Sequence, residues 1–170
     1  MLRSSLISSK IDTLISDLAD KNGTTRQRAR LALVDMGEAA VPRLTDLLSD
    51  KREFVRWEAA SALGDIADPS SAPALVQALE DKVFDVRWLA AQALIHIGMD
   101  GLIPALKAVL LNKDQDWLWD GTRHIVHDLA TDDNEMLLTP LKLAFDDVDS
   151  RMKVPIETRK VLIKLGVIHE

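Results

Sequence analysis

The chain of 170 residues contains no cysteine and no tyrosine. Without cysteine, disulfide bonds, thiolate metal sites and cysteine nucleophiles are excluded. No run of 18 apolar residues occurs, and the opening segment MLRSSLISSK lacks the continuous apolar stretch of a signal peptide. We therefore expect a soluble, cytoplasmic protein that has no part embedded in a membrane.

Basic residues are outnumbered, since 21 Lys and Arg face 27 Asp and Glu and leave a formal net charge of −6. A field of that sign repels a phosphate backbone, so we expect no nucleic-acid partner. The seven glycines and four histidines include no Gly-rich phosphate loop, nucleophile elbow or zinc-protease helix. The sequence therefore predicts no enzyme and no cofactor.

The most informative feature that is present is an internal repeat. Pro42, Pro73 and Pro104 recur at an interval of 31 residues, and a leucine follows each of them two positions later. A period between about 20 and 50 residues is typical of solenoids, in which each unit contacts mainly its neighbours. We expect a single all-α domain over residues 1–170, a right-handed α-solenoid of about four to five antiparallel helix pairs.

The repeat divides the chain into three parts. Residues 1–22 are expected to form an N-terminal cap helix, residues 25–112 three regular repeats, and residues 113–170 degenerate C-terminal repeats. Each regular repeat should contain a first helix rich in small residues and a second helix that begins near its proline. In the degenerate part we expect a first helix over Trp117–Ala130, a second helix near Glu135–Phe145, and one more first helix over Pro155–Gly166.

The string VRWEAASALGDIADPSSAPALVQALED, from Val55 to Asp81, resembles the short HEAT-like repeat first associated with phycobilisome lyases. Val86 to Leu110 resembles it almost as well. That family includes bilin lyases, a diiron hydroxylase, designed binding scaffolds and many interaction modules. The resemblance implies a scaffold or adaptor for a protein or peptide partner, with an auxiliary role in tetrapyrrole or bilin attachment as an alternative.

A metal-dependent hydroxylase of similar repeats is a further alternative, which the sequence disfavours. In deoxyhypusine hydroxylases, His-Glu pairs just after the repeating Arg bind iron, whereas here those places hold Gln27-Arg28, Trp57-Glu58 and Trp88-Leu89. The only His-Glu pair, His169-Glu170, lies outside the motif. If the chain is related to these hydroxylases, this pattern indicates that it has lost their iron ligands.

Helical-wheel geometry at about 100° per residue separates an inward from an outward side of each first helix. Val55, Ala59, Ala62, Leu63 and Ile66 form the inward side in the second repeat. The outward residues of the three first helices are Phe54, Trp57, Glu58, Ser61 and Asp65, then Trp88, Leu89, Gln92 and His96, then Trp117, Asp120, His124 and Asp128. Designed binders of similar repeats are varied at matching positions on their concave surface, so the resemblance implies that these residues form a partner-binding groove.

Equivalent outward residues should form lateral rungs across neighbouring helices. The rungs are Trp57, Trp88 and Asp120; Ser61, Gln92 and His124; and Asp65, His96 and Asp128. We expect a partner's apolar or basic segment to cover the tryptophans and the acidic residues to attract it. Tryptophans that merely cover gaps between helices are the structural alternative. For the third rung we expect solvated side chains, not a metal site, which needs three or four converging ligands.

The repeating Arg26, Arg56 and Arg87 face the side between repeats. We expect them to pair with carboxylates of the preceding loops, such as Asp50 and Asp81, and so to link the units. The sequence leaves the partner's identity and the oligomeric state open.

Overall fold

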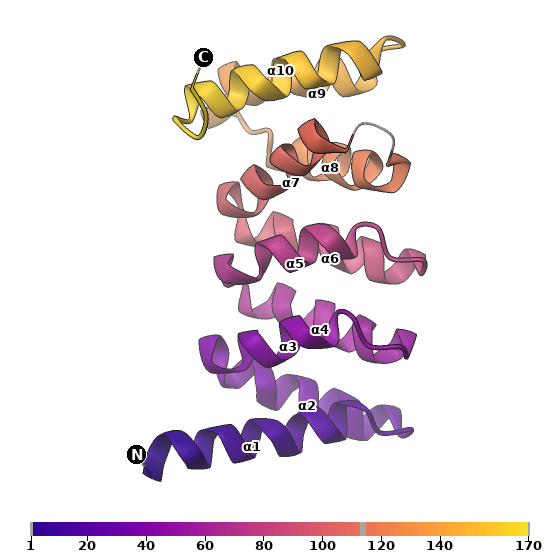
Figure 1. The fold of residues 1–170 in the computed structure, drawn as a ribbon, viewed down its shortest axis with the longest axis vertical. Coiled ribbons are helices and arrows are strands. Elements are labelled where there is room, and N and C mark those ends of the chain that lie inside the picture. The colour runs from indigo at the N-terminus through magenta and orange to yellow at the C-terminus, as the bar shows by residue number, and fades with distance from the viewer. Residues whose placement is uncertain (1, 113–114, 170) are drawn as a thin grey trace.

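The computed structural model describes residues 2–112 and 115–169, and every regular element in those ranges is helical. The helices stack along one long axis as an α-solenoid, which confirms the predicted fold class (Figure 1). The α-helices are α1 (Leu2–Leu18), α2 (Gly23–Asp35), α3 (Val41–Leu47), α4 (Glu53–Ile66), α5 (Ala72–Ala78), α6 (Phe84–Ile97), α7 (Met99–Leu111), α8 (Asp116–Leu129), α9 (Glu135–Asp146) and α10 (Ser150–Lys164).

Two layers run along the stack. The first helices α2, α4, α6 and α8 pack against one another in succession, and α3, α5 and α7 pack against this row (Figure 1). Helix α1 packs on α2 and α3 at the N-terminal end. Because each unit contacts mainly the next, the outer side of the first helices forms one continuous surface.

The repeating apolar residues form the core between the layers. Leu44, Leu75 and Leu106, which follow the prolines, are completely buried. Of the residues that the wheel placed on the inward side of α4, Val55, Ala59, Ala62 and Leu63 are completely buried and Ile66 is partly buried. Small residues allow the first helices to approach closely, since a Cβ on Gly64 would lie 3.2 Å from the Cβ of Ala93.

The prolines do not all occupy equivalent places. Pro42 and Pro73 lie in the first turn of α3 and α5, each after a short 3₁₀ turn, at Gly37–Ala40 and Pro69–Ser71. Pro104 instead lies inside α7, which begins at Met99 directly after α6. The prediction that each second helix begins near its proline is therefore wrong for Pro104, because α7 begins five residues earlier. Gly98 forms this abrupt junction between α6 and α7. Its backbone angles, φ 80° and ψ −138°, are unfavourable for residues that have a side chain.

The C-terminal helices also differ from the prediction. Helix α10 begins at Ser150, so Pro155 lies inside it and does not start it. The helix packs against α9 and against α7, a second helix, whereas a further first helix would continue the row of α8. Buried Val154, Val161 and Leu162 supply its contacts with the core cluster.

Candidate functional site

The predicted outward residues lie on α4, α6 and α8, but their exposure varies. Asp65, Trp88, His96, Trp117, Asp120 and Asp128 are exposed; Phe54, Trp57, Ser61, Leu89, Gln92 and His124 are partly buried; and Glu58 is buried. Leu89 packs against the core, which limits its availability to a partner. The wheel is thus correct for the general side of each helix and wrong for the exposure of Glu58.

A hollow of about 240 Å³ lies between α6 and α8, and we call it the aromatic pocket. Phe84, Trp88 and Trp117 are 63%, 47% and 45% exposed and surround it. Its remaining lining residues are Arg87, Ala91, Asp120, Gly121 and His124. Exposed aromatic side chains that converge on one hollow are characteristic of interaction sites, because they bury a large apolar area when a partner binds.

Trp88 is held in place by His124. The two rings stack with centroids 4.7 Å apart and an interplanar angle of 26°. Gln92 Nε2 lies 2.9 Å from His124 Nε2, and because an amide nitrogen donates, this imidazole nitrogen accepts. Gln92 and His124 are neighbours in the predicted rung of Ser61, Gln92 and His124, and this contact joins them. It positions His124, which in turn supports one face of Trp88.

Arginines cover the other aromatic residues of this face. The guanidinium of Arg30 lies 5.6 Å from the Trp57 ring centroid, and that of Arg26 lies 4.8 Å from the Phe54 ring. At these distances the positive charge is attracted to the ring face. Trp57 is therefore covered by a side chain of the same protein, whereas no arginine in the described ranges lies over the Trp88 ring.

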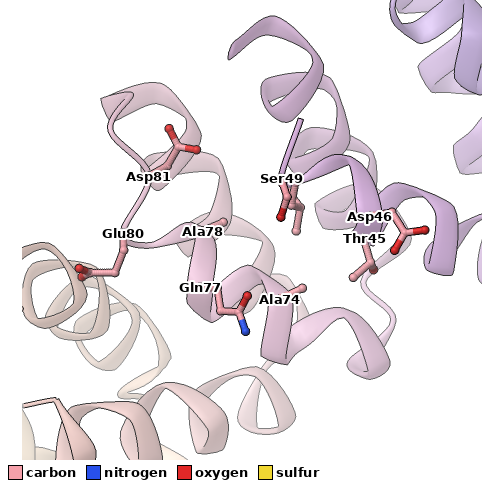
Figure 2. A pocket seen from close by; sticks show the side chains of 9 residues that line it. Thr45, Asp46, Ser49, Ala74, Gln77, Ala78, Glu80 and Asp81 are labelled. Carbon is pink, nitrogen blue, oxygen red and sulfur yellow. The ribbon is translucent and has the colours of Figure 1, made fainter. Parts of the chain in front are cut away.

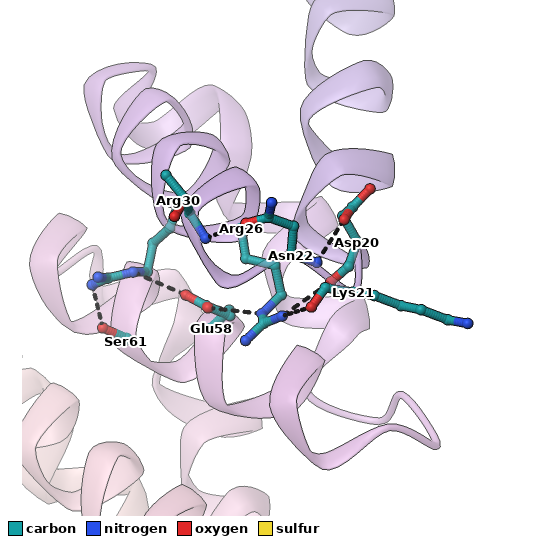
Figure 3. Close-up of polar contacts among 8 residues, drawn as sticks. Asp20, Lys21, Asn22, Arg26, Arg30, Glu58 and Ser61 are labelled. Atoms are coloured by element: carbon teal, nitrogen blue, oxygen red, sulfur yellow. Dashed lines mark hydrogen bonds and ion pairs between the residues drawn. The ribbon is translucent and has the colours of Figure 1, made fainter.

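Glu58 does not face outward as the wheel predicted. Its side chain lies between Arg26 and Arg30, with N···O distances of 3.2 Å and 3.0 Å, as Figure 3 shows. The residue is only 5% exposed. Two positive groups from α2 draw the carboxylate into the contact between α2 and α4, because a buried charge needs a partner.

Arg30 is a residue of this face that the sequence analysis missed. It donates to Ser61 Oγ at 2.7 Å and pairs with Glu58 (Figure 3). It also lies 3.6 Å from Asp65. A signal was available, since alignment of Arg26 with Arg56 places Arg30 where the next repeats have Ala60 and Ala91.

The repeating arginines link the units, with a different partner pattern from the predicted one. Arg26, Arg56 and Arg87 each donate from Nη1 to the backbone carbonyl six residues earlier, so the preceding loop supplies a carbonyl. Arg56 then pairs with Asp81 of the following loop, through Nε at 2.5 Å and Nη2 at 2.9 Å. Burial raises the pKa of Asp81, but the hydrogen bonds from Arg56 and the Val83 N–H outweigh it and lower the pKa overall.

In α8 the place of the repeating arginine is taken by Trp119, which is 6% exposed. Its ring contacts Phe145 of α9 edge to face, with centroids 5.9 Å apart. Arg151 of α10 lies over the same ring at 4.6 Å and pairs with Asp116. An aromatic side chain thus replaces the charged link where the regular repeats end.

The third predicted rung forms no converging site. His96 Nδ1 lies 3.0 Å from the Gly64 carbonyl oxygen, while Asp65 and Asp128 are exposed. Within the described ranges, no three histidine or carboxylate side chains come together as metal ligands would. His127, the other histidine of α8, has its Nε2 3.1 Å from Asp146 of α9.

A second hollow, of about 440 Å³, lies on the second helices α3 and α5 (Figure 2). Its lining side chains are mainly small or polar and none is aromatic: Thr45, Asp46, Leu48, Ser49, Ala74, Gln77, Ala78, Glu80 and Asp81. It offers a partner little apolar area per residue despite its volume, so the aromatic pocket is the better candidate site.

Fold and surface together define an α-solenoid with an aromatic site on its first helices. The model of the family described as HEAT repeats matches residues 11–95 and 55–123. Since the matches span more than half of the sequence, the chain belongs to the HEAT repeat family. Such repeats typically form scaffolds for protein interactions. A comparison with curated proteins finds no match. No helix in the part of the chain that the structure describes is long and apolar enough to cross a membrane.

Proposed function

We propose that this protein is an interaction scaffold that binds a segment of a partner protein along α4, α6 and α8. The single observation that carries the proposal is the aromatic pocket, in which Phe84, Trp88 and Trp117 are all about half exposed or more. Aromatic side chains at the centre of an interface contribute much of the binding free energy. An apolar side chain of the partner would enter this pocket.

Exposed carboxylates of α8 would orient the bound segment. Asp120 lines the pocket and Asp128 lies two turns further along the helix. Asp65 on α4 is also exposed, but it lies 3.6 Å from Arg30, which partly neutralises its charge. The two aspartates of α8 favour basic residues in the flanks of the segment through long-range attraction. Glu58 is not part of this set, because its charge is already paired with Arg26 and Arg30.

The tetrapyrrole alternative has less support. One face of the Trp88 ring is already stacked on His124, so a planar ligand could stack only on the other face. The pocket volume of about 240 Å³ is also below the range of roughly 300–1,000 Å³ that is common for small-molecule sites. A peptide, which needs a pocket for only one side chain, fits the site better.

The test is a selection of binding peptides from a displayed random library, followed by affinity measurements by fluorescence anisotropy. We expect Trp88→Ala to weaken the selected peptides at least about tenfold, which is roughly 1.4 kcal/mol. Leu111→Ala is the matched control, because Leu111 is an exposed apolar residue on α7, away from the pocket. If Trp88→Ala and Leu111→Ala bind the peptides as tightly as the unmodified protein, the aromatic pocket is not the binding site.

A further inference from the structure

Arg56 shows how a repeating arginine is satisfied when a carboxylate follows it. Its Nη1 donates to the Asp50 carbonyl, and its Nε and Nη2 edge binds the carboxylate of Asp81 from the next loop. Arg26 also has both kinds of partner, with Nη1 on the Asp20 carbonyl and Nε on Glu58. The two carboxylates come from different places, because Glu58 lies on α4 of the next repeat and Asp81 lies in the loop after α5 of the same repeat.

Arg87 has the first half of this arrangement and lacks the second. Its Nη1 donates to the Asp81 carbonyl at 2.8 Å, and Asp81 lies six residues earlier, as do the carbonyl partners of Arg26 and Arg56. At the position of Asp81 in the next loop, however, stands Asn112, whose amide donates to the Ala108 carbonyl instead. No carboxylate in the described ranges is within ion-pair distance of Arg87.

The guanidinium of Arg87 is nevertheless held firmly in the aromatic pocket. It lies 4.3 Å from the Trp117 ring centroid and 5.5 Å from that of Phe84. These contacts and the bond to the Asp81 carbonyl restrict the side chain, so little entropy remains to be lost on binding. The planar Nε and Nη2 edge matches the two oxygens of a carboxylate.

We infer that the partner segment supplies an Asp or Glu side chain that binds the free edge of Arg87, next to the apolar side chain that enters the aromatic pocket. The inference rests on the proposed function and specifies the segment. We favour an Asp or Glu side chain over a free anion because Arg26 and Arg56 also bind the carboxylates of such side chains. Asp120 on the pocket wall disfavours a small free anion, which would lack apolar contacts to offset the repulsion.

The experiment uses the peptides selected on the full chain. We expect the enriched sequences to contain Asp or Glu beside an apolar residue, and we expect replacement of that acid by its amide to weaken binding at least about tenfold. When the protein carries Arg87→Gln, replacing the acid of the peptide by its amide should change the affinity less than about twofold. The carboxylate of the peptide then has no arginine to bind. Arg87→Lys should restore only part of the affinity, since lysine cannot bind two oxygens in a fixed plane. Arg159→Gln, an exposed arginine on α10, is the control.

The outcomes separate this inference from the proposed function. The inference is wrong if the selected peptides lack acidic residues, or if the amide replacement has the same effect in the unmodified protein and in Arg87→Gln. In either case a loss of affinity in Trp88→Ala would leave the proposed function standing. If Arg87→Gln binds too weakly to measure, the amide replacement on the unmodified protein decides, and a loss under about twofold overturns the inference.

Discussion

Trp57 and Trp88 occupy equivalent positions in consecutive repeats, yet their surroundings differ. Arg30 covers Trp57, whereas Trp88 stacks on His124 and stays 47% exposed beside the aromatic pocket. The difference begins one repeat earlier, where Arg30 replaces an alanine and also draws Glu58 inward. Single residues that break the repeat therefore decide which side chains remain available to a partner.

Glu58 offers a direct test of this pairing. Glu58→Gln keeps the side-chain shape but leaves Arg26 and Arg30 without their buried counter-charge, and we expect the free energy of unfolding to fall by about 2 kcal/mol. Asp128→Asn is the control, because Asp128 is exposed on α8. Urea denaturation measures both variants. Equal midpoints for the two would show that the carboxylate of Glu58 is solvated and not paired.

The aspartates that bind arginines predict how stability depends on pH. The side-chain hydrogen bond from Arg52 lowers the pKa of Asp50 to about 2, and the pKa of Asp81 is also lowered. Because these pKa values lie below the unfolded value of about 3.9, the stabilisation is present above pH 4 and is lost as the pH falls towards about 2. Asp81→Asn should lose less stability over this interval than the unmodified protein. Urea midpoints across the acid range measure the effect, and parallel curves for the two proteins would contradict it.

At the scale of helices, close packing holds α6, which carries Trp88 and Arg87, against its neighbours. Gly64 of α4 approaches Ala93 of α6, and Gly101 of α7 lies against the last turns of α6. An added Cβ on Gly101 would come within 2.3 Å of the Leu94 carbonyl oxygen, a backbone atom that cannot move aside. The short distance between α6 and α7 thus depends on glycine.

Gly101→Ala should therefore destabilise the protein by about 2 kcal/mol or more, although alanine favours helix formation. Gly23→Ala is a matched control at a helical glycine, since its added Cβ would meet only the end of the Arg26 side chain at 3.6 Å. Thermal unfolding followed by circular dichroism compares them. A Gly101→Ala variant as stable as Gly23→Ala would mean that α6 and α7 are less closely packed.

At the scale of the whole molecule, the solenoid couples each unit mainly to its neighbours. Helices α2 and α10 lie near opposite ends of the stack (Figure 1), and each has a completely buried leucine, Leu33 and Leu162. A core substitution should therefore lower the free energy of local unfolding near the substituted residue and affect it much less at the far end of the stack.

Leu162→Ala should accelerate amide hydrogen exchange in α8–α10 and leave α2–α4 almost unchanged, because the cavity removes contacts only at the C-terminal end. Leu33→Ala should produce the reverse pattern. Hydrogen exchange followed by mass spectrometry locates the effect. Uniform acceleration along the chain in both variants would indicate one cooperative unit.

The sequence by itself determined the α-solenoid, the paired helices of the regular repeats and the general side on which Trp88, Trp117 and His124 lie. These features depend on periodicity, and periodicity is a local property of the chain. The tertiary structure decided that Glu58 is buried, that α10 packs on α7, and that no carboxylate in the described part of the chain pairs with Arg87. Each of these depends on which side chains meet across units that are distant in the sequence, and the offset between equivalent residues varies from repeat to repeat. Spacing alone therefore locates the face, and only the packed helices show which of its charges and rings remain free.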